Sequence, residues 1–149
     1  MITLKVISKA IATQIKQGLI NTSYSTVDFS STDIKEEIKR PCFYIDFFKN
    51  KTGKFNASNK ERTLTTKLYY FATNIRKCKL ELMEIQDLLE NMFLEGLKVN
   101  DNFIVNIDDG IEFDIDKQNG FLAATFDLYT VEEIPEDESI PYMDSLQIN

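Results

Sequence analysis

The chain has 149 residues, of which 43% are hydrophobic and 28% charged, with 24 acidic side chains against 17 basic ones. That length suits one domain, and a chain of this size can bury roughly 70% of the surface that its unfolded form exposes. The composition therefore excludes a globally disordered protein. No stretch approaches the roughly 20 apolar residues of a membrane-spanning helix, and lysines interrupt the N-terminal segment where a signal peptide has its apolar core. We expect a soluble cytoplasmic protein that makes no contact with a membrane.

Several residue types that support catalysis are scarce. Histidine is absent, which removes the commonest general base and a common metal ligand. Only two cysteines occur, Cys42 and Cys78, too few for a disulfide scaffold or a four-cysteine zinc site, so we expect free thiols in or beside the core. The phosphate-binding sequences G-x-x-x-x-G-K and G-x-G-x-x-G are absent too. These absences leave few options for catalysis, and we predict no catalytic residue, no metal site and no cofactor.

The charges are divided unevenly along the chain. Residues 1–80 carry 15 bases and 6 acids, a balance of +9, whereas residues 81–149 carry 2 bases and 18 acids, a balance of −16; together they give the net charge of −7. Such asymmetry is typical of nucleic-acid contact or of electrostatically steered association. It equally fits basic and acidic elements that lie side by side within one monomer.

The first half of the chain predicts a helix followed by a hairpin. Apolar residues at three- and four-residue steps predict a helix over residues 2–20, and a short strand follows over residues 24–29. Aromatic and β-branched residues predict a strand over residues 42–49, and alternation resumes over residues 62–73. The polar, basic residues 50–60 have the composition of a long mobile loop, so the hairpin would have an exposed basic tip. The stripe of the helix consists of Leu4, Ile7, Ile11, Ile15 and Leu19.

The second half predicts another helix and then a meander of strands. Residues 78–97 have a helical apolar stripe and an acidic polar face. Three short strands follow over residues 103–108, 111–115 and 121–131, separated by Asp-Gly and Asn-Gly pairs that are typical of tight turns. The apolar stripe of this helix consists of Leu82, Ile85, Leu89, Met92 and Gly96, widened by Leu88 and Phe93.

These elements predict an α+β fold. An antiparallel sheet, built from the long hairpin and the C-terminal meander, would carry both helices on one face. No internal repeat and no linker is visible, so residues 1–132 would form a single domain. Residues 133–149 are rich in acids and would form a tail that only a partner orders.

One candidate chemical site is a group of carboxylates near the predicted turns. Asp114 and Asp116 would share one strand face, and paired acids can hold Mg²⁺ for phosphoryl chemistry. The calcium-loop pattern fails, because Gln118 and Thr125 stand where ligands are needed. Acids also flank tight turns for conformational reasons alone, which is the interpretation we favour. The complete group is Asp108, Asp109, Asp114 and Asp116.

A second candidate is the basic hairpin tip together with the acids of the second half. Basic and aromatic residues together can bind a nucleic-acid backbone, but we favour a protein-docking role and expect no specific nucleic-acid binding. The basic set comprises Lys49, Lys51, Lys54, Phe55, Lys60 and Arg62. The acids expected to face it on a partner or a second copy are Glu84, Asp87, Glu90, Glu132, Glu133 and Glu136.

A third candidate is a set of aromatic residues in the two hairpin strands. Alternate members should fill the core, and those on the opposite face would leave apolar area exposed, which usually marks a partner surface. The set comprises Phe43, Tyr44, Phe47, Phe48, Tyr69, Tyr70 and Phe71.

The order of these elements resembles a known family. A helix and a short strand precede the sequence Arg40-Pro41-Cys42-Phe43-Tyr44-Ile45, a basic segment and a strand with Tyr69-Tyr70, and a Glu- and Leu-rich helix then precedes the last antiparallel strands. Over roughly residues 1–132 this is similar to the tail terminator, or tail completion, proteins of bacteriophages. The forms it resembles occur in phages of Gram-positive bacteria and in phage-tail-like particles.

The resemblance implies a structural protein with no enzymatic activity, which forms a hexameric ring. Such a ring caps the tail tube, ends its growth and offers a surface for neck or head-completion proteins. In a contractile tail the ring also meets the sheath protein and is called a collar. The expected partners are thus copies of the chain and the tail tube protein. The protein would assemble in the host bacterial cytoplasm and then belong to the virion tail or tail-like particle.

The division of charge along the chain is consistent with a ring, but two alternatives remain open. A ring of more than two subunits joins two different surfaces, which suits a subunit that is basic in one half and acidic in the other. One alternative is a small Mg²⁺-dependent nucleic-acid-processing enzyme that uses Asp114 and Asp116. The other is an adaptor module that binds partners through its acidic C-terminus.

Overall fold

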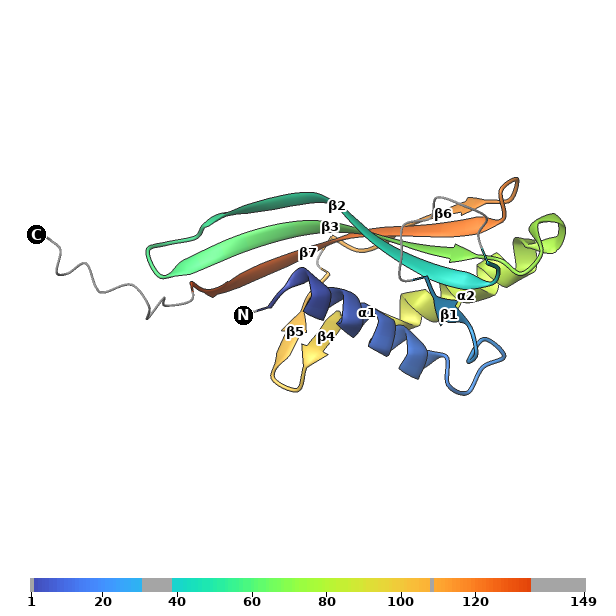
Figure 1. The fold of residues 1–149 in the computed structure, drawn as a ribbon, viewed down its shortest axis with the longest axis horizontal. Coiled ribbons are helices and arrows are strands. Elements are labelled where there is room, and N and C mark those ends of the chain that lie inside the picture. Colours follow the sequence, from blue (N-terminus) through green and yellow to red (C-terminus); the bar gives the residue numbers. More distant parts are fainter. Residues whose placement is uncertain (1, 31–38, 108, 135–149) are drawn as a thin grey trace, which may run out of the picture.

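The computed structural model describes residues 2–30, 39–107 and 109–134. Within these ranges the chain forms two α-helices, a 3-10 helix and seven strands (Figure 1). The α+β class predicted from the sequence is confirmed. In chain order the elements are α1 (Leu4–Gly18), β1 (Asp28–Phe29), β2 (Cys42–Lys54), β3 (Asn59–Phe71), the 3-10 helix η1 (Ile75–Lys77), α2 (Lys79–Met92), β4 (Leu97–Asn100), β5 (Phe103–Val105), β6 (Glu112–Asp116) and β7 (Phe121–Glu133).

The strands form a mixed five-stranded sheet and a separate hairpin. The order in the large sheet is β1-β2-β3-β7-β6, in which β1 is parallel to β2 and every other pair is antiparallel. The hairpin of β4 and β5 forms a sheet of its own beside α1. Both helices lie on one side of the large sheet, as the sequence predicts (Figure 1). No helix in the described ranges is long and apolar enough to cross a membrane.

The core lies between the helices and one face of β3 and β7. Side chains at every second position of these strands are buried and pack against the two predicted helical stripes. Leu4 is the exception, since 38% of it is exposed at the rim of an open groove beside α1. The largest fully buried side chains of this core are Ile7, Ile11, Ile15, Phe43, Leu64, Leu68, Tyr70, Leu82, Ile85, Leu89, Leu97 and Leu122.

The predicted end of the second helix was wrong. α2 stops at Met92, and Leu97 begins β4. Gly96 lies between them with φ of +93°, and a Cβ at this position would lie 2.5 Å from the carbonyl oxygen of Val105. Glycine therefore permits both the left-handed turn and the close approach of the β4–β5 hairpin.

The predicted meander was also wrong in part. β6 and β7 form the expected hairpin, with Gly120 at φ of +68° in its turn. However, β5 pairs with β4 and not with β6, so the Asp109-Gly110 turn joins strands of different sheets. The sequence signal for a turn was correct, but it carries no information about which strands pair.

The predicted mobile loop over residues 50–60 was largely wrong. β2 continues to Lys54 and β3 begins at Asn59, so only residues 55–58 lie outside the ladder. The turn is held by Asn56, whose Oδ1 accepts hydrogen bonds from the backbone N–H groups of Ser58 and Asn59, both at 2.9 Å. Polar strands of this kind lack the alternation of apolar and polar residues that indicates a strand in a sequence.

The acidic segment begins later than its composition suggests. Glu132 and Glu133 belong to β7, where they pair with Lys60 and Asn59 of β3. They are therefore strand residues, and the expected tail, with Glu136, lies outside the described residues.

Candidate functional site

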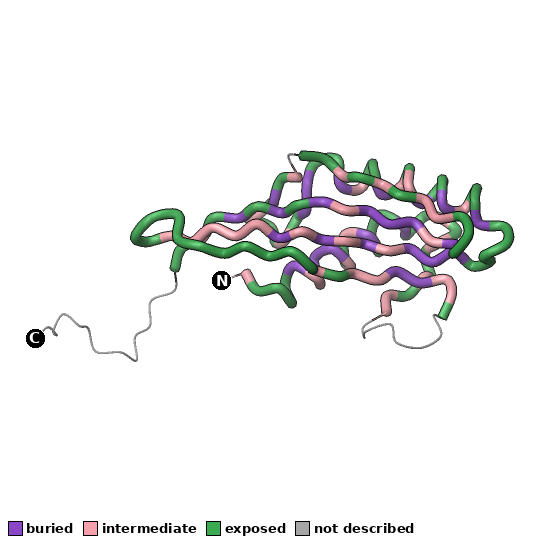
Figure 2. The backbone as a smooth tube through the Cα atoms, turned by 90° about the horizontal axis from the view of Figure 1, so that it is seen from above, coloured by how far each residue is buried: buried purple, intermediate pink, exposed green. Residues whose placement is uncertain are grey.

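The feature that distinguishes this fold is a β-sheet arm. We define the arm as residues 49–65 of the β2–β3 hairpin together with residues 127–133 of β7. It extends past the start of α1, so no helix of the described residues covers its far end (Figure 1). Residues 49–58 are exposed throughout, and Figure 2 shows this end of the tube in green. The arm thus presents both faces and both edges to solvent at its tip.

A β-bulge sets the directions in which the arm side chains point. Between Phe47 and Lys49 the register of β2 against β3 shifts by one residue, and Phe48 is extra. From there Lys49 pairs with Thr65 and Lys51 with Thr63, positions of β3 that face away from the helices. The bulge therefore turns a strand that began with aromatic residues into one that presents lysines on the helix-free face.

The predicted basic residues divide into exposed and engaged groups. Lys49, Lys51 and Lys54 are exposed, and Phe55 at the turn is 56% exposed. No ion pair within the described residues involves these three lysines. They are available to a partner.

Lys60 and Arg62 instead fix the N-terminal segment to the arm. Lys60 Nζ lies 3.6 Å from Glu132 Oε1, and the second oxygen of Glu132 accepts a 3.0 Å hydrogen bond from the backbone N–H of Ile2. Arg62 Nη1 donates a 3.4 Å hydrogen bond to the carbonyl oxygen of Ile2. We expected Lys60 and Glu132 to meet between copies, but they pair within one copy.

The predicted acids of α2 are also partly engaged within the chain. Glu84 accepts a 2.7 Å hydrogen bond from the Tyr24 hydroxyl, and Glu90 accepts one of 3.0 Å from the Gln86 amide. Asp87 is exposed. Burial, followed by the hydrogen bond to Glu84, raises the pKa of Tyr24 well above its usual value. Asp87 and the exposed face of Glu90 therefore lie open to a partner.

A neighbouring acid, Glu81, was not singled out from the sequence. Its Oε2 accepts hydrogen bonds from the Tyr70 hydroxyl at 2.6 Å and from the backbone N–H of Thr73 at 3.0 Å. Tyr70 is fully buried, and burial together with this bond raises its pKa far above the usual range. Glu81 thereby ties α2 to the end of β3. The sequence signal was available only as a Glu in the first turn of a helix.

The helix-free face of the sheet carries part of the predicted aromatic set. Tyr69 lies between Tyr44, Phe71 and Phe121, with ring centroids 5.8 to 6.2 Å away, and the Arg40 guanidinium lies over Phe71. Phe43 and Tyr70 are core residues, whereas Phe48 is 54% exposed. The aromatic residues thus divide between the core and the opposite face, as alternation predicts.

Of the predicted carboxylates, Asp116 stabilises the turn between β6 and β7. Asp116 accepts hydrogen bonds from the backbone N–H of Asn119 at 2.9 Å and from its side-chain amide at 3.0 Å. These bonds lower the pKa of Asp116. Asp114 is exposed, and Asp108 lies outside the described residues. In the described ranges no three His, Cys, Asp or Glu side chains come close enough to hold a metal ion. The geometry favours turn stabilisation over an Mg²⁺ site.

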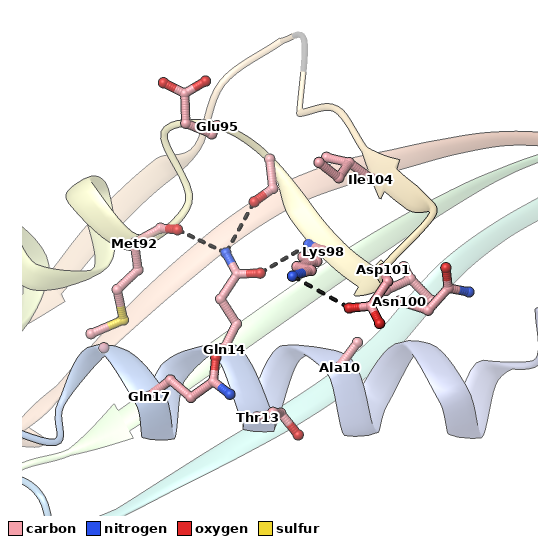
Figure 3. A pocket seen from close by; sticks show the side chains of 13 residues that line it. Ala10, Thr13, Gln14, Gln17, Met92, Glu95, Lys98, Asn100, Asp101 and Ile104 are labelled. Atoms are coloured by element: carbon pink, nitrogen blue, oxygen red, sulfur yellow. Dashed lines mark hydrogen bonds and ion pairs between the residues drawn. The ribbon is translucent and has the colours of Figure 1, made fainter.

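A groove of about 630 Å³ lies between α1 and the β4–β5 hairpin (Figure 3). Gln14 reaches across it from α1. Its amide nitrogen donates to the carbonyl oxygens of Met92 at 2.7 Å and Gly96 at 3.0 Å, and its Oε1 accepts from the backbone N–H of Lys98 at 2.9 Å. All three bonds are used to join elements, so this polar side chain is structural.

The family comparison agrees with the resemblance noted in the sequence. A family described as phage tail terminator protein matches residues 6–140, which include every element of the fold except the first two residues of α1. No curated protein matches the chain. The family is structural, and its members are components of the phage tail. The chain belongs to the phage tail terminator family.

Proposed function

We propose that copies of this chain form a closed ring, hexameric as the family resemblance implies, that caps the tail tube and ends its growth. In a contractile tail the same ring would meet the end of the sheath and serve as a collar. Where a head is present, the ring would offer the attachment surface for neck proteins. Assembly would take place in the host bacterial cytoplasm.

This proposal rests on the positions at which this member of the family exposes its basic and acidic side chains. The arm carries the exposed lysines Lys49, Lys51 and Lys54, whereas α2, with the exposed Asp87, lies under the other end of the sheet (Figure 1). Within the described residues these three lysines and Asp87 form no ion pair with each other. They suit heterologous contacts, in which two different surfaces meet and repetition can close a ring. Such complementarity mainly orients subunits and speeds association.

The experiment that tests this function combines the purified protein with its tail tube protein during tube polymerisation. Electron microscopy should show six-fold rings at one end of tubes whose growth has stopped. Rings should also form from the protein alone at high concentration. Tubes that elongate equally with and without the protein, and carry no ring, would overturn the proposal.

A further inference from the structure

The arm has two open edges, which are the outer sides of β2 and β7. β1 pairs with β2 only through Cys42 and Phe43, and β6 pairs with β7 only as far as Thr125. Beyond these points no strand of the described ranges covers the outer side of β2 over residues 45–54 or of β7 over residues 126–133. Both edges are long, since eight strand residues span about 26 Å.

Open edges of this length invite pairing with another strand. Each presents a row of backbone N–H and C=O groups that another strand can satisfy. In the part of the chain that the structure describes, no helix lies beneath the tip of the arm to supply a core (Figure 1). Small sheets need a covered apolar face for independent stability. Lysines and a β-bulge on an edge strand hinder unspecific strand pairing, and β2 has both. A strand that pairs with β2 must therefore match its charge and its irregular register.

The two edges carry opposite charge on the same face. Lys49 and Asp127 both pair with Thr65, from opposite sides, and so mark the two edges of one row. Lys51, which pairs with Thr63, continues the basic edge on this face, and Glu133, which pairs with Asn59, ends the acidic edge. Lys54 pairs with Lys60 and so belongs to the same edge but to the other face. Asp127 and Glu133 are exposed.

Strand direction favours the same arrangement. β2 and β7 are each antiparallel to β3, so they run parallel to each other toward the tip. A rotation about a ring axis would bring the β7 edge of one copy beside the β2 edge of the next, as a parallel pair. A two-fold dimer would instead join like edges, lysines against lysines or acids against acids, which is unfavourable.

We propose that the β7 edge of one copy pairs with the β2 edge of the next copy, so that the arms form one continuous sheet around the ring. This inference rests on the proposed ring and names its interface. In this arrangement Asp127 of one copy lies within reach of Lys49 or Lys51 of the next. A second copy of this chain is therefore the occupant of both edges.

Disulfide trapping between the edges tests this pairing. Lys49→Cys and Asp127→Cys in one chain cannot join within that chain, because β3 separates them by two strand spacings, about 10 Å, and disulfides need Cα atoms within about 7 Å. The pair Lys51→Cys with Asp127→Cys covers the other register. Mild oxidation of assembled protein should give a ladder of covalent oligomers for at least one pair. The native Cys42 and Cys78 are buried. Oxidation of the chain without added cysteines measures any background crosslinking through them.

Single variants provide the matched controls. Each single cysteine variant alone should give no oligomers. A mixture of the Asp127→Cys chain with the lysine variant of the register that crosslinks, Lys49→Cys or Lys51→Cys, should give a covalent dimer. Crosslinking of any single variant with itself would mean that like edges meet and would overturn the inference.

The two proposals can fail separately. Rings by electron microscopy without crosslinks in either register would overturn the edge pairing, leave the ring intact and assign the edges to another occupant, such as a tube subunit. Crosslinked open chains that never close would support the edge pairing and overturn the ring. Protein that neither assembles nor crosslinks, alone or with tube protein, would overturn both.

Discussion

The guanidinium of Arg40 donates a 2.8 Å hydrogen bond to the carbonyl oxygen of Gly120, 80 residues later in the chain. The same nitrogen donates to Ala72 at 3.0 Å, and the second nitrogen donates to Asn119 at 2.7 Å. Arg40 therefore joins the start of β2 to the end of β3 and to the β6–β7 turn. A Cβ at Gly120 would lie 2.9 Å from the Arg40 nitrogen, so glycine also makes room for this contact.

Replacing this arginine tests the role of its forked shape. Arg40→Lys keeps the charge but cannot direct two nitrogens at three carbonyl groups. Since a hydrogen bond to a charged group contributes about 1.5–3 kcal/mol, the free energy of unfolding should fall by about 2 kcal/mol in urea denaturation. Arg76→Lys, at an exposed position, is the matched control and should change it little. Equal effects of the two substitutions would contradict the assignment.

The face of α2 that packs on the sheet can be tested with two leucines of the same helix. Leu89 is 1% exposed and Leu80 is 73% exposed. Leu89→Ala should lower the free energy of unfolding by about 2–5 kcal/mol, because it removes buried methyl groups and leaves a cavity. Leu80→Ala should stay within about 0.5 kcal/mol of the parent. A loss below about 1 kcal/mol for Leu89→Ala would mean that the buried face is assigned wrongly.

Gln14 should contribute more to the stability of the fold than its place on a polar helix face suggests. Gln14→Leu would leave the carbonyl groups of Met92 and Gly96 and the N–H of Lys98 without their partner. We expect the free energy of unfolding to fall by about 1–3 kcal/mol, measured by chemical denaturation. Gln17→Leu, one turn later and exposed, is the control. Indistinguishable stabilities would show that the three bonds contribute nothing.

The raised pKa values of Tyr24 and Tyr70 predict a loss of stability at alkaline pH. The pKa values of Tyr24 and Tyr70 in the folded protein lie well above the usual value of about 10. Above that pH the unfolded chain loses these protons while the folded chain keeps them, so stability present below about pH 10 falls as the pH rises. Denaturation midpoints measured between about pH 8 and pH 12 should show this fall.

The double variant Tyr24→Phe and Tyr70→Phe isolates the contribution of these two hydroxyl groups to the loss of stability at alkaline pH. Its midpoint should decline less steeply than that of the parent over the same pH values. An identical slope would contradict the assignment of the effect to these two hydroxyl groups.

The exposed lysines of the arm should control how fast subunits associate. Reversing Lys49, Lys51 and Lys54 to Glu should slow assembly about tenfold or more at low salt, because steering by opposite charges is lost. At about 0.15 M salt the difference should shrink, since screening extends over only about 8 Å. Light scattering during assembly measures the rate. Exposed pairs contribute only about 0–1 kcal/mol each, so the stability of the final ring should change modestly.

The matched control places the same charge change on α1. Lys5, Lys9 and Lys16 are exposed there, and their reversal to Glu alters the net charge equally. If both triple variants slow assembly alike, the effect reflects overall charge and not the arm.

The sequence by itself determined the elements whose residues repeat with a clear period. The stripes Ile7–Ile11–Ile15 and Leu82–Ile85–Leu89 are the buried faces of the two helices, because only a 3.6-residue period places such residues on one side. The alternation after Cys42 and after Arg62 likewise predicted two strands of a hairpin, and element order pointed to the family that the comparison confirms.

The tertiary structure alone decided which polar residues are engaged and which are free. Lys60 and Lys51 look alike in the sequence, yet Lys60 faces Glu132 while Lys51 lies on the other face, since the bulge at Phe48 fixes the strand register. The position of Asp127 also depends on strand register, because its pairing with Thr65 places it on the opposite side of β3 from Lys49. Local patterns specify which side of a strand a residue occupies, whereas neighbours distant in the chain specify what it meets there.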